Sequence, residues 1–166
     1  MAKVYLGLGS NVEPHKYLRM GIRELGNLFG VLELSNVYRS KAVGFEGADF
    51  LNLVVGLESD LSPLEIHKHI EKLHVMAGRQ RGESRYSPRT LDIDLLLYDD
   101  LVIDRAPIVL PREDVLKYSF VLGPLAEIAP DLRHPQTGRQ IAEHWAEFDK
   151  SSHPLEVSDL ADSDDS

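Results

Sequence analysis

The spacing of apolar residues switches between two periods along the chain, and this switching limits the fold more than any other feature. Residues 3–8 alternate, with Val4, Leu6 and Leu8 on one face, which is the pattern of a strand. Residues 14–29 instead place apolar side chains at helical spacing, and Gly30 is suited to end that helix. The chain therefore opens with a strand and an amphipathic helix.

The two patterns alternate again further along. Strand patterns follow at residues 32–38, 50–58 and 91–98. A capping box at Ser62-Pro63-Leu64-Glu65 predicts a second helix, which ends at Gly78. The order βαββαβ predicts an α+β fold, a ferredoxin-like antiparallel sheet with both helices on one face and the other face left for loops or ligands.

An added C-terminal segment is predicted to be mostly helical. Short strands are expected near residues 101–103 and 108–110. Helices are expected over residues 115–129, in pieces broken by Pro124, and over residues 141–148.

Composition and charge exclude several classes of protein. No apolar run approaches the roughly 20 residues of a membrane span. The chain has no cysteine, so we expect a cytoplasmic protein without disulfides. Five of the nine net negative charges lie in residues 151–166, predicted to be a disordered acidic tail on one domain of residues 1–150. No broad basic face is present, so we expect a monomer that binds small molecules and no nucleic acid or membrane.

Two aspartates interrupt the last of these strand patterns. Asp92 and Asp94 are two residues apart and share one face, and the other face carries Leu91, Ile93, Leu95 and Leu97. Carboxylates about 5 to 7 Å apart repel each other by roughly 2 to 3 kcal/mol at an effective dielectric constant near 20. A cation between them would relieve this repulsion, and Mg²⁺ takes such oxygen ligands together with substrate phosphates. The alternative is an exposed acidic pair on the solvent side of the sheet.

Arginines precede the aspartates in a single short loop. They are Arg79, Arg81, Arg85 and Arg89. Guanidinium groups are the preferred side-chain partners of phosphate oxygens, so we expect this loop to close over a polyphosphate that a metal holds from the other side. The alternative is a solvated charged loop.

Two glycines on the first strand predict space for a flat ligand. The run Gly7-Leu8-Gly9-Ser10-Asn11 lacks the third glycine of a dinucleotide fingerprint. Gly7 and Gly9 would instead let a ligand approach the sheet, where Phe50 and Asn52 could recognise a heterocycle. Taken alone, Phe50 and Asn52 are also compatible with ordinary core and surface positions.

The run Ser87-Pro88-Arg89-Thr90-Leu91-Asp92-Ile93-Asp94-Leu95-Leu96 resembles the signature of the 6-hydroxymethyl-7,8-dihydropterin pyrophosphokinase family of folate biosynthesis. Further matching runs occur in family order. They are GLGSN, Tyr38-Arg39-Ser40, Phe50-Leu51-Asn52, Gly78-Arg79, Ser119-Phe120-Val121-Leu122 and the run from Pro124 to Pro130. The resemblance covers about residues 3 to 148.

The resemblance implies transfer of a pyrophosphoryl group from ATP to the pterin hydroxymethyl group, with AMP as the second product. It implies that Asp92 and Asp94 bind two Mg²⁺ ions and that Arg79 and Arg89 hold the phosphates during catalysis. The implied ATP contacts are Arg81, His74, Leu95 and Arg112. The implied pterin contacts are Val43, Phe50, Asn52 and Phe120.

Several positions depart from the family pattern. Tyr86 stands where tryptophan is common, Gly82 where a lysine can occur, and His74 where a glutamate is frequent. Arg112-Glu113 replaces the histidine that usually follows Leu-Pro. A divergent paralogue that binds pterin or nucleotide with altered or lost activity therefore stays open as an alternative. So does a two-metal nucleotidyl transferase.

Overall fold

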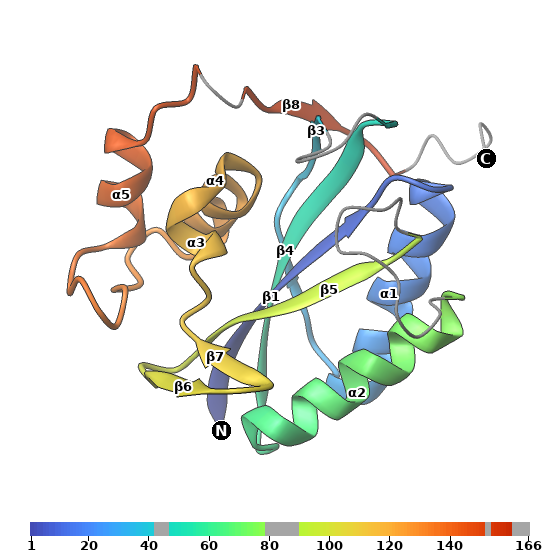
Figure 1. The fold of residues 1–166 in the computed structure, drawn as a ribbon, viewed down its shortest axis with the longest axis horizontal. Coiled ribbons are helices and arrows are strands. Elements are labelled where there is room, and N and C mark those ends of the chain that lie inside the picture. Colours follow the sequence, from blue (N-terminus) through green and yellow to red (C-terminus); the bar gives the residue numbers. More distant parts are fainter. Residues whose placement is uncertain (42–46, 79–89, 152–153, 161–166) are drawn as a thin grey trace.

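The computed structural model describes residues 1–41, 47–78, 90–151 and 154–160. An antiparallel sheet forms its centre, with strand order β5-β1-β4-β3-β8 and with β2 paired to β4 (Figure 1). Its strands are β1 (Ala2–Ser10), β2 (Glu33–Leu34), β3 (Val37–Ser40), β4 (Phe50–Ser59), β5 (Asp92–Tyr98) and β8 (Glu156–Ser158). The predicted α+β fold with an antiparallel sheet is confirmed.

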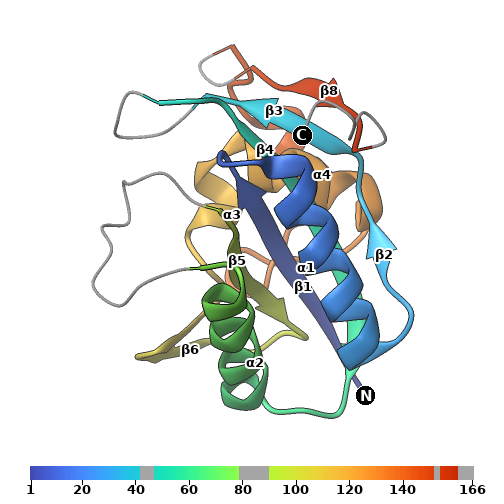
Figure 2. The same ribbon diagram turned by 90° about the vertical axis from the view of Figure 1, so that its right-hand side faces the viewer.

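Two long helices cover one face of the sheet, as predicted. These are α1 (Pro14–Phe29) and α2 (Pro63–Met76), which lie side by side in Figure 2. Leu18 and Leu25 of α1 are fully buried against the apolar face of β1. In the capping box of α2, the Glu65 backbone amide donates to the Ser62 hydroxyl and the Ser62 amide donates to the Glu65 carboxylate.

Three shorter helices cover part of the opposite face, which the sequence predicted to be open. They are α3 (Asp114–Lys117), α4 (Ser119–Ile128) and α5 (Ile141–Glu147). Leu122 and Leu125 of α4 pack with Val54 and Leu96 of the sheet in a second core. The face is therefore closed over one half, because β4 and β5 carry apolar residues on both sides.

The predicted break at Pro124 is wrong. Pro124 lies inside α4, and the chain breaks instead at Tyr118, between α3 and α4. Gly123 precedes the proline and has no Cβ to clash with its ring. A Cβ at Gly123 would lie 2.9 Å from the Trp145 ring of α5, so α4 is packed closely on both sides. Burial of the helix offsets the hydrogen bond that proline removes.

A small hairpin and part of the tail complete the fold. The hairpin pairs β6 (Ile103–Arg105) with β7 (Ile108–Leu110). The prediction of a disordered tail is wrong for β8, which pairs with β3. Without β8, β3 would be a sheet edge with unpaired backbone groups, and Leu160 adds apolar contact with the first core. In the described ranges, no helix combines the length and apolar character needed to cross a membrane.

Candidate active site

The two aspartates of β5 lie opposite the two glycines of β1. Asp92 pairs with Gly9 and Asp94 pairs with Gly7 across the antiparallel ladder. Both aspartates are half-buried, whereas Ile93 between them is buried in the core under α1 and α2. The predicted alternation of β5 is confirmed from Asp92 to Leu95, and it presents the carboxylates on the side away from α1 and α2. It is wrong at Leu97, because a register shift against β1 turns this residue into the second core.

A first cleft extends from the aspartates across the sheet. Its floor includes Gly7, Gly9 and Asn52, its walls include Phe50 and Phe120, and it encloses about 790 Å³ including its open mouth. A Cβ at Gly9 would lie 2.9 Å from Oδ1 of Asn52, so only glycine leaves this side chain undisturbed. Asn52 is buried, and its Nδ2 donates a 2.7 Å hydrogen bond to the Ser40 hydroxyl. The amide is therefore held in a fixed position at the floor of the cleft.

An aromatic pair forms one wall of the first cleft. The rings of Tyr118 and Phe120 stack with 5.0 Å between centroids and an interplanar angle of 16°. Both residues line the cleft, as does Phe50 of β4. Nζ of Lys117 lies 5.3 Å from the centroid of the Tyr118 ring. The sequence analysis missed Tyr118, and its position two residues before Phe120 was the available signal.

A second cleft meets the first at the aspartates. It is bounded by α2, by β7 and by Arg112, and it encloses about 540 Å³ including its mouth. Asp92 and Asp94 line both clefts. The predicted residues His74 and Leu95 line this second cleft, although both side chains are largely buried. Two ligands, one in each cleft, would therefore meet at the carboxylates.

His74 makes contacts that attach α2 to β5. Its Nε2 accepts a 2.9 Å hydrogen bond from the Ile93 backbone amide, and its Nδ1 lies 3.5 Å from a carboxylate oxygen of Glu71. Only 3% of the residue is exposed. In this arrangement His74 fixes the segment of β5 that carries the two aspartates.

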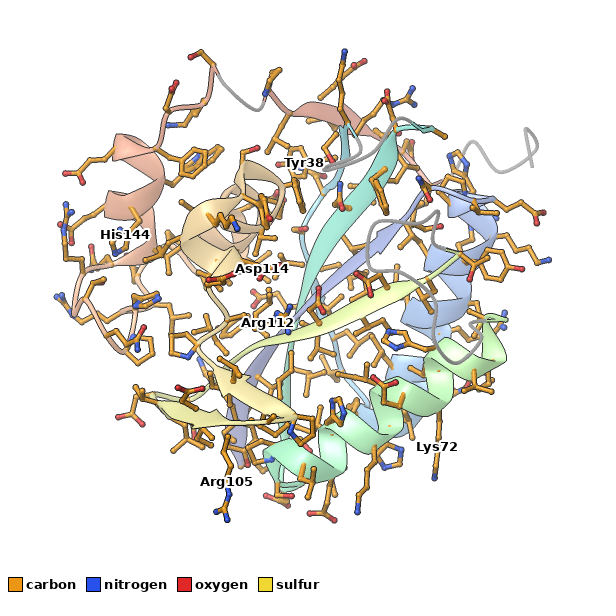
Figure 3. All side chains as sticks on the ribbon, viewed as in Figure 1. Tyr38, Lys72, Arg105, Arg112, Asp114 and His144 are labelled. Atoms are coloured by element: carbon orange, nitrogen blue, oxygen red, sulfur yellow. The ribbon has the colours of Figure 1, made fainter. Side chains whose placement is uncertain are left out.

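Arg112 lies between two carboxylates at the junction of the clefts. Its terminal nitrogen is 3.8 Å from Oδ1 of Asp94, and its Nε is 3.6 Å from Oδ1 of Asp114. Figure 3 shows Arg112 and Asp114 pointing toward each other beside β5. The Nε is buried and has no hydrogen-bond partner among the described residues. Sequence analysis missed Asp114, because its place in the candidate site depends on this contact with Arg112.

Several predicted site residues lie outside the described residues. They are Val43, Arg79, Arg81 and Arg89. The described ranges contain no group of three or more acidic or histidine side chains that could hold a metal on its own. Two carboxylates on one face of β5 nevertheless fit Mg²⁺, which completes its shell with water and substrate phosphate oxygens.

Comparison with known proteins identifies the family. A sequence model of the 7,8-dihydro-6-hydroxymethylpterin-pyrophosphokinase family matches residues 5–130. The chain belongs to this family. It is 40% identical over 137 residues to the 2-amino-4-hydroxy-6-hydroxymethyldihydropteridine pyrophosphokinase of Aquifex aeolicus, covering 81% of this chain and 85% of that protein. The Synechocystis protein of the same name is 39% identical, over 82% and 71% of the two chains. The resemblance inferred from the Asp92–Asp94 motif is thus confirmed, and the chain is a pyrophosphokinase of this family.

Solved structures agree on the fold. An HPPK-DHPS triple mutant of Plasmodium falciparum superimposes with a TM-score of 0.72 at 12% identity, over 88% of this chain. Another HPPK-DHPS structure, in complex with substrates, gives 0.73 at 11% identity, over 90% of this chain. This chain spans less than half of each of those proteins, 41% and 44%.

Proposed function

We propose that this chain transfers the pyrophosphoryl group of ATP to the hydroxymethyl group of 6-hydroxymethyl-7,8-dihydropterin in folate biosynthesis. The observation that carries this proposal is the position of Asp92 and Asp94 at the junction of two clefts. The reaction joins two substrates of different chemistry, a flat heterocycle and a charged nucleotide. The two clefts differ in the same way, one being aromatic and the other largely polar.

The first cleft is assigned to the pterin. The rings of Phe50 and Phe120 form its walls and would sandwich a flat heterocycle. Asn52 would hydrogen-bond the heterocycle, because its buried amide is already held by Ser40. Val43 is assigned to the same site from the family motif. Gly9 supports this assignment, since it keeps the floor of the cleft low beside Asn52.

The second cleft is assigned to ATP. Asp92 and Asp94 would hold two Mg²⁺ ions, which neutralise phosphate charge when bound. Arg79 and Arg89 would bind the transferred group as catalytic residues, and Arg81 would contact the nucleotide. Arginine is suited to these roles because its planar fork matches phosphate oxygens.

Three further residues are assigned to the nucleotide side. Leu95 and His74 support the wall of the second cleft, and Arg112 would contact phosphate oxygens from the opposite wall. His74 acts through β5 in this proposal, because its Nε2 is engaged by the Ile93 amide.

The proposed reaction is an in-line displacement. The pterin hydroxyl oxygen forms a bond to the β-phosphorus of ATP, and the bond from that phosphorus to the oxygen bridging to the α-phosphate breaks. The leaving group is AMP, and the hydroxyl proton is released to solvent. The chain contributes binding, orientation and charge stabilisation, which are the main sources of catalysis in phosphoryl transfer.

The remaining assignments concern topology and setting. The order β1-α1-β3-β4-α2-β5, with the spatial order β5-β1-β4-β3, supports a ferredoxin-like core extended by the C-terminal helices. We assign the protein to the cytoplasm as a monomer that uses two small-molecule substrates.

The test is the product formed from ATP, Mg²⁺ and 6-hydroxymethyl-7,8-dihydropterin. Wild-type protein should release AMP, whereas release of inorganic pyrophosphate would support the nucleotidyl transferase alternative. Asp94→Asn should lower the rate by about 100-fold or more, because a phosphate-bound cation would lose a charged ligand. Asp100→Asn is the control, since it removes an exposed carboxylate just beyond β5. Pterin binding without AMP release would support the alternative of a relative that has lost the chemistry.

A further inference from the structure

Arg112 occupies a position where a cation bound to Asp94 would repel it. We propose that Arg112 is a counter-ion of this carboxylate, helping to neutralise Asp94 before a divalent cation binds and shifting toward Asp114 afterwards. This inference rests on the proposed function insofar as it takes Asp94 to be a metal ligand. It adds a coupling between metal and nucleotide through one side chain.

The distances show an arginine shared between two partners. Contacts of 3.8 Å to Asp94 and 3.6 Å to Asp114 are longer than the roughly 2.7 to 2.9 Å of a charge-assisted hydrogen bond. Neither carboxylate therefore holds the guanidinium in the bidentate geometry that arginine favours. The Nε is buried and has no hydrogen-bond partner in the described ranges, which costs free energy. A shift of the side chain that gives Nε a partner would recover this cost.

The backbone at Arg112 is held in place, which confines the motion to the side chain. Its amide donates a 3.0 Å hydrogen bond to the carbonyl of Leu96 on β5. Its carbonyl accepts a 3.2 Å hydrogen bond from the Val115 amide at the start of α3. These hydrogen bonds hold the Arg112 backbone between β5 and α3, while its guanidinium lies within reach of both carboxylates.

The sign of the electrostatic effect differs between the two ligands. A divalent cation on Asp94 places two positive charges close together, so Arg112 opposes binding of the metal alone. Phosphate oxygens in the second cleft, which Arg112 lines, attract the same guanidinium. Arg112 thus disfavours the bare metal and favours the metal together with the nucleotide, which makes the binding of the two cooperative.

Asp114 is the group that receives the displaced guanidinium. Its side chain is 15% exposed and faces Nε of Arg112. Removing its charge would leave Asp94 as the acidic partner of Arg112 among the described ion pairs. The pairing with Asp94 would then strengthen, and the metal would have to compete with it.

The experiment measures Mn²⁺ binding to the full chain without nucleotide or pterin, by electron paramagnetic resonance of the free ion. We expect Arg112→Gln to tighten Mn²⁺ binding by about threefold to tenfold, a range set by the partial exposure of the pair, and Asp114→Asn to weaken it. In contrast, Arg112→Gln should weaken binding of a non-hydrolysable ATP analogue with Mg²⁺. Arg105→Gln is the matched control, because it removes an exposed arginine from β6 and should leave Mn²⁺ affinity unchanged.

Equal or weaker Mn²⁺ binding by Arg112→Gln would overturn the proposal. If Arg112→Gln does not fold, the Asp114→Asn variant tests the proposal by itself. Unchanged or tighter Mn²⁺ binding by Asp114→Asn would then overturn the proposal. Asp94→Asn must lose the binding, which verifies that the ion is at this site. The readout needs no catalysis, so failure of the AMP assay would reject the proposed function and leave this result standing.

Discussion

The Ile93 backbone amide donates a 2.9 Å hydrogen bond to Nε2 of His74, and this bond connects α2 to the strand that carries both aspartates. Among the described strands, β5 lies at the edge of the sheet, next to β1. His74 therefore supplies a side-chain acceptor to an edge strand between Asp92 and Asp94. The helix and the site are coupled through one buried side chain.

We predict that His74→Leu destabilises the protein by about 1 to 3 kcal/mol, because the Ile93 amide would be left buried without its acceptor. The free energy of unfolding in urea measures this. His74→Gln should recover part of the loss, since its amide oxygen can accept the same bond. Lys72→Leu, an exposed position on α2, should change stability by less than about 0.5 kcal/mol. Equal effects of the Leu and Gln substitutions at position 74 would refute the role of the hydrogen bond.

Gly9→Ala should weaken pterin binding by about tenfold. The new Cβ would lie 2.9 Å from Oδ1 of Asn52 and would displace this amide from the floor of the first cleft. Gly26→Ala on α1 is the comparison, because its Cβ would meet the Leu32 side chain at 4.0 Å and the residue lines neither cleft. Titration of pterin fluorescence measures both affinities. Similar affinities for the two variants would be inconsistent with a pterin site beside Asn52.

Tyr118→Leu should weaken pterin binding by about twofold to tenfold, the cost of losing one stacked ring behind Phe120. Nucleotide affinity should not change, because Tyr118 lines only the first of the two clefts. Tyr17→Leu on α1 is a matched control, since a lysine also lies over that ring, 4.9 Å from its centroid. Isothermal titration with pterin and with an ATP analogue separates the two effects. A loss of both affinities would show a general structural role instead.

The stability of the C-terminal part should depend on pH through His134. Burial, followed by the neighbouring His144, lowers the pKa of His134 below its ordinary 6.5. Unfolded His134 takes up a proton near pH 6.5, whereas the folded side chain stays neutral to lower pH. The effect of His134 on the free energy of unfolding is therefore most favourable above pH 6.5. This free energy falls as the pH drops from 6.5 through the pKa of the folded His134 side chain.

His134→Asn should remove this part of the pH dependence. Urea unfolding between about pH 7 and pH 5 should show a smaller decline in the variant than in wild type. The Nδ1 of His134 accepts backbone hydrogen bonds from Gln136 and Thr137, and asparagine can supply an acceptor oxygen there. An equal decline in both proteins would contradict the lowered pKa.

Local patterns determined the elements and the pair of aspartates. The bounds of α1 and the capping box of α2 follow from spacing and end signals within a few residues. The side shared by Asp92 and Asp94 follows from the two-residue period of a strand. The motif around Asp92 and Asp94 then indicated the family and, through it, the activity.

Contacts between distant segments decided the rest. Helix α4 covers the second face of the sheet although it contains Pro124. It does so because Val54 and Leu96 present apolar side chains on that face, against which Leu122 packs. Pairing with β8 provides hydrogen-bond partners for the backbone of β3, and no local pattern in the tail predicted this strand. The family resemblance implied an ATP contact for Arg112, but only the folded chain places its guanidinium between Asp94 and Asp114. Spacing along the chain predicts which way a side chain faces within a regular strand, but bulges such as the one before Leu97 and the partners of charged groups are set only when the sheet and helices pack.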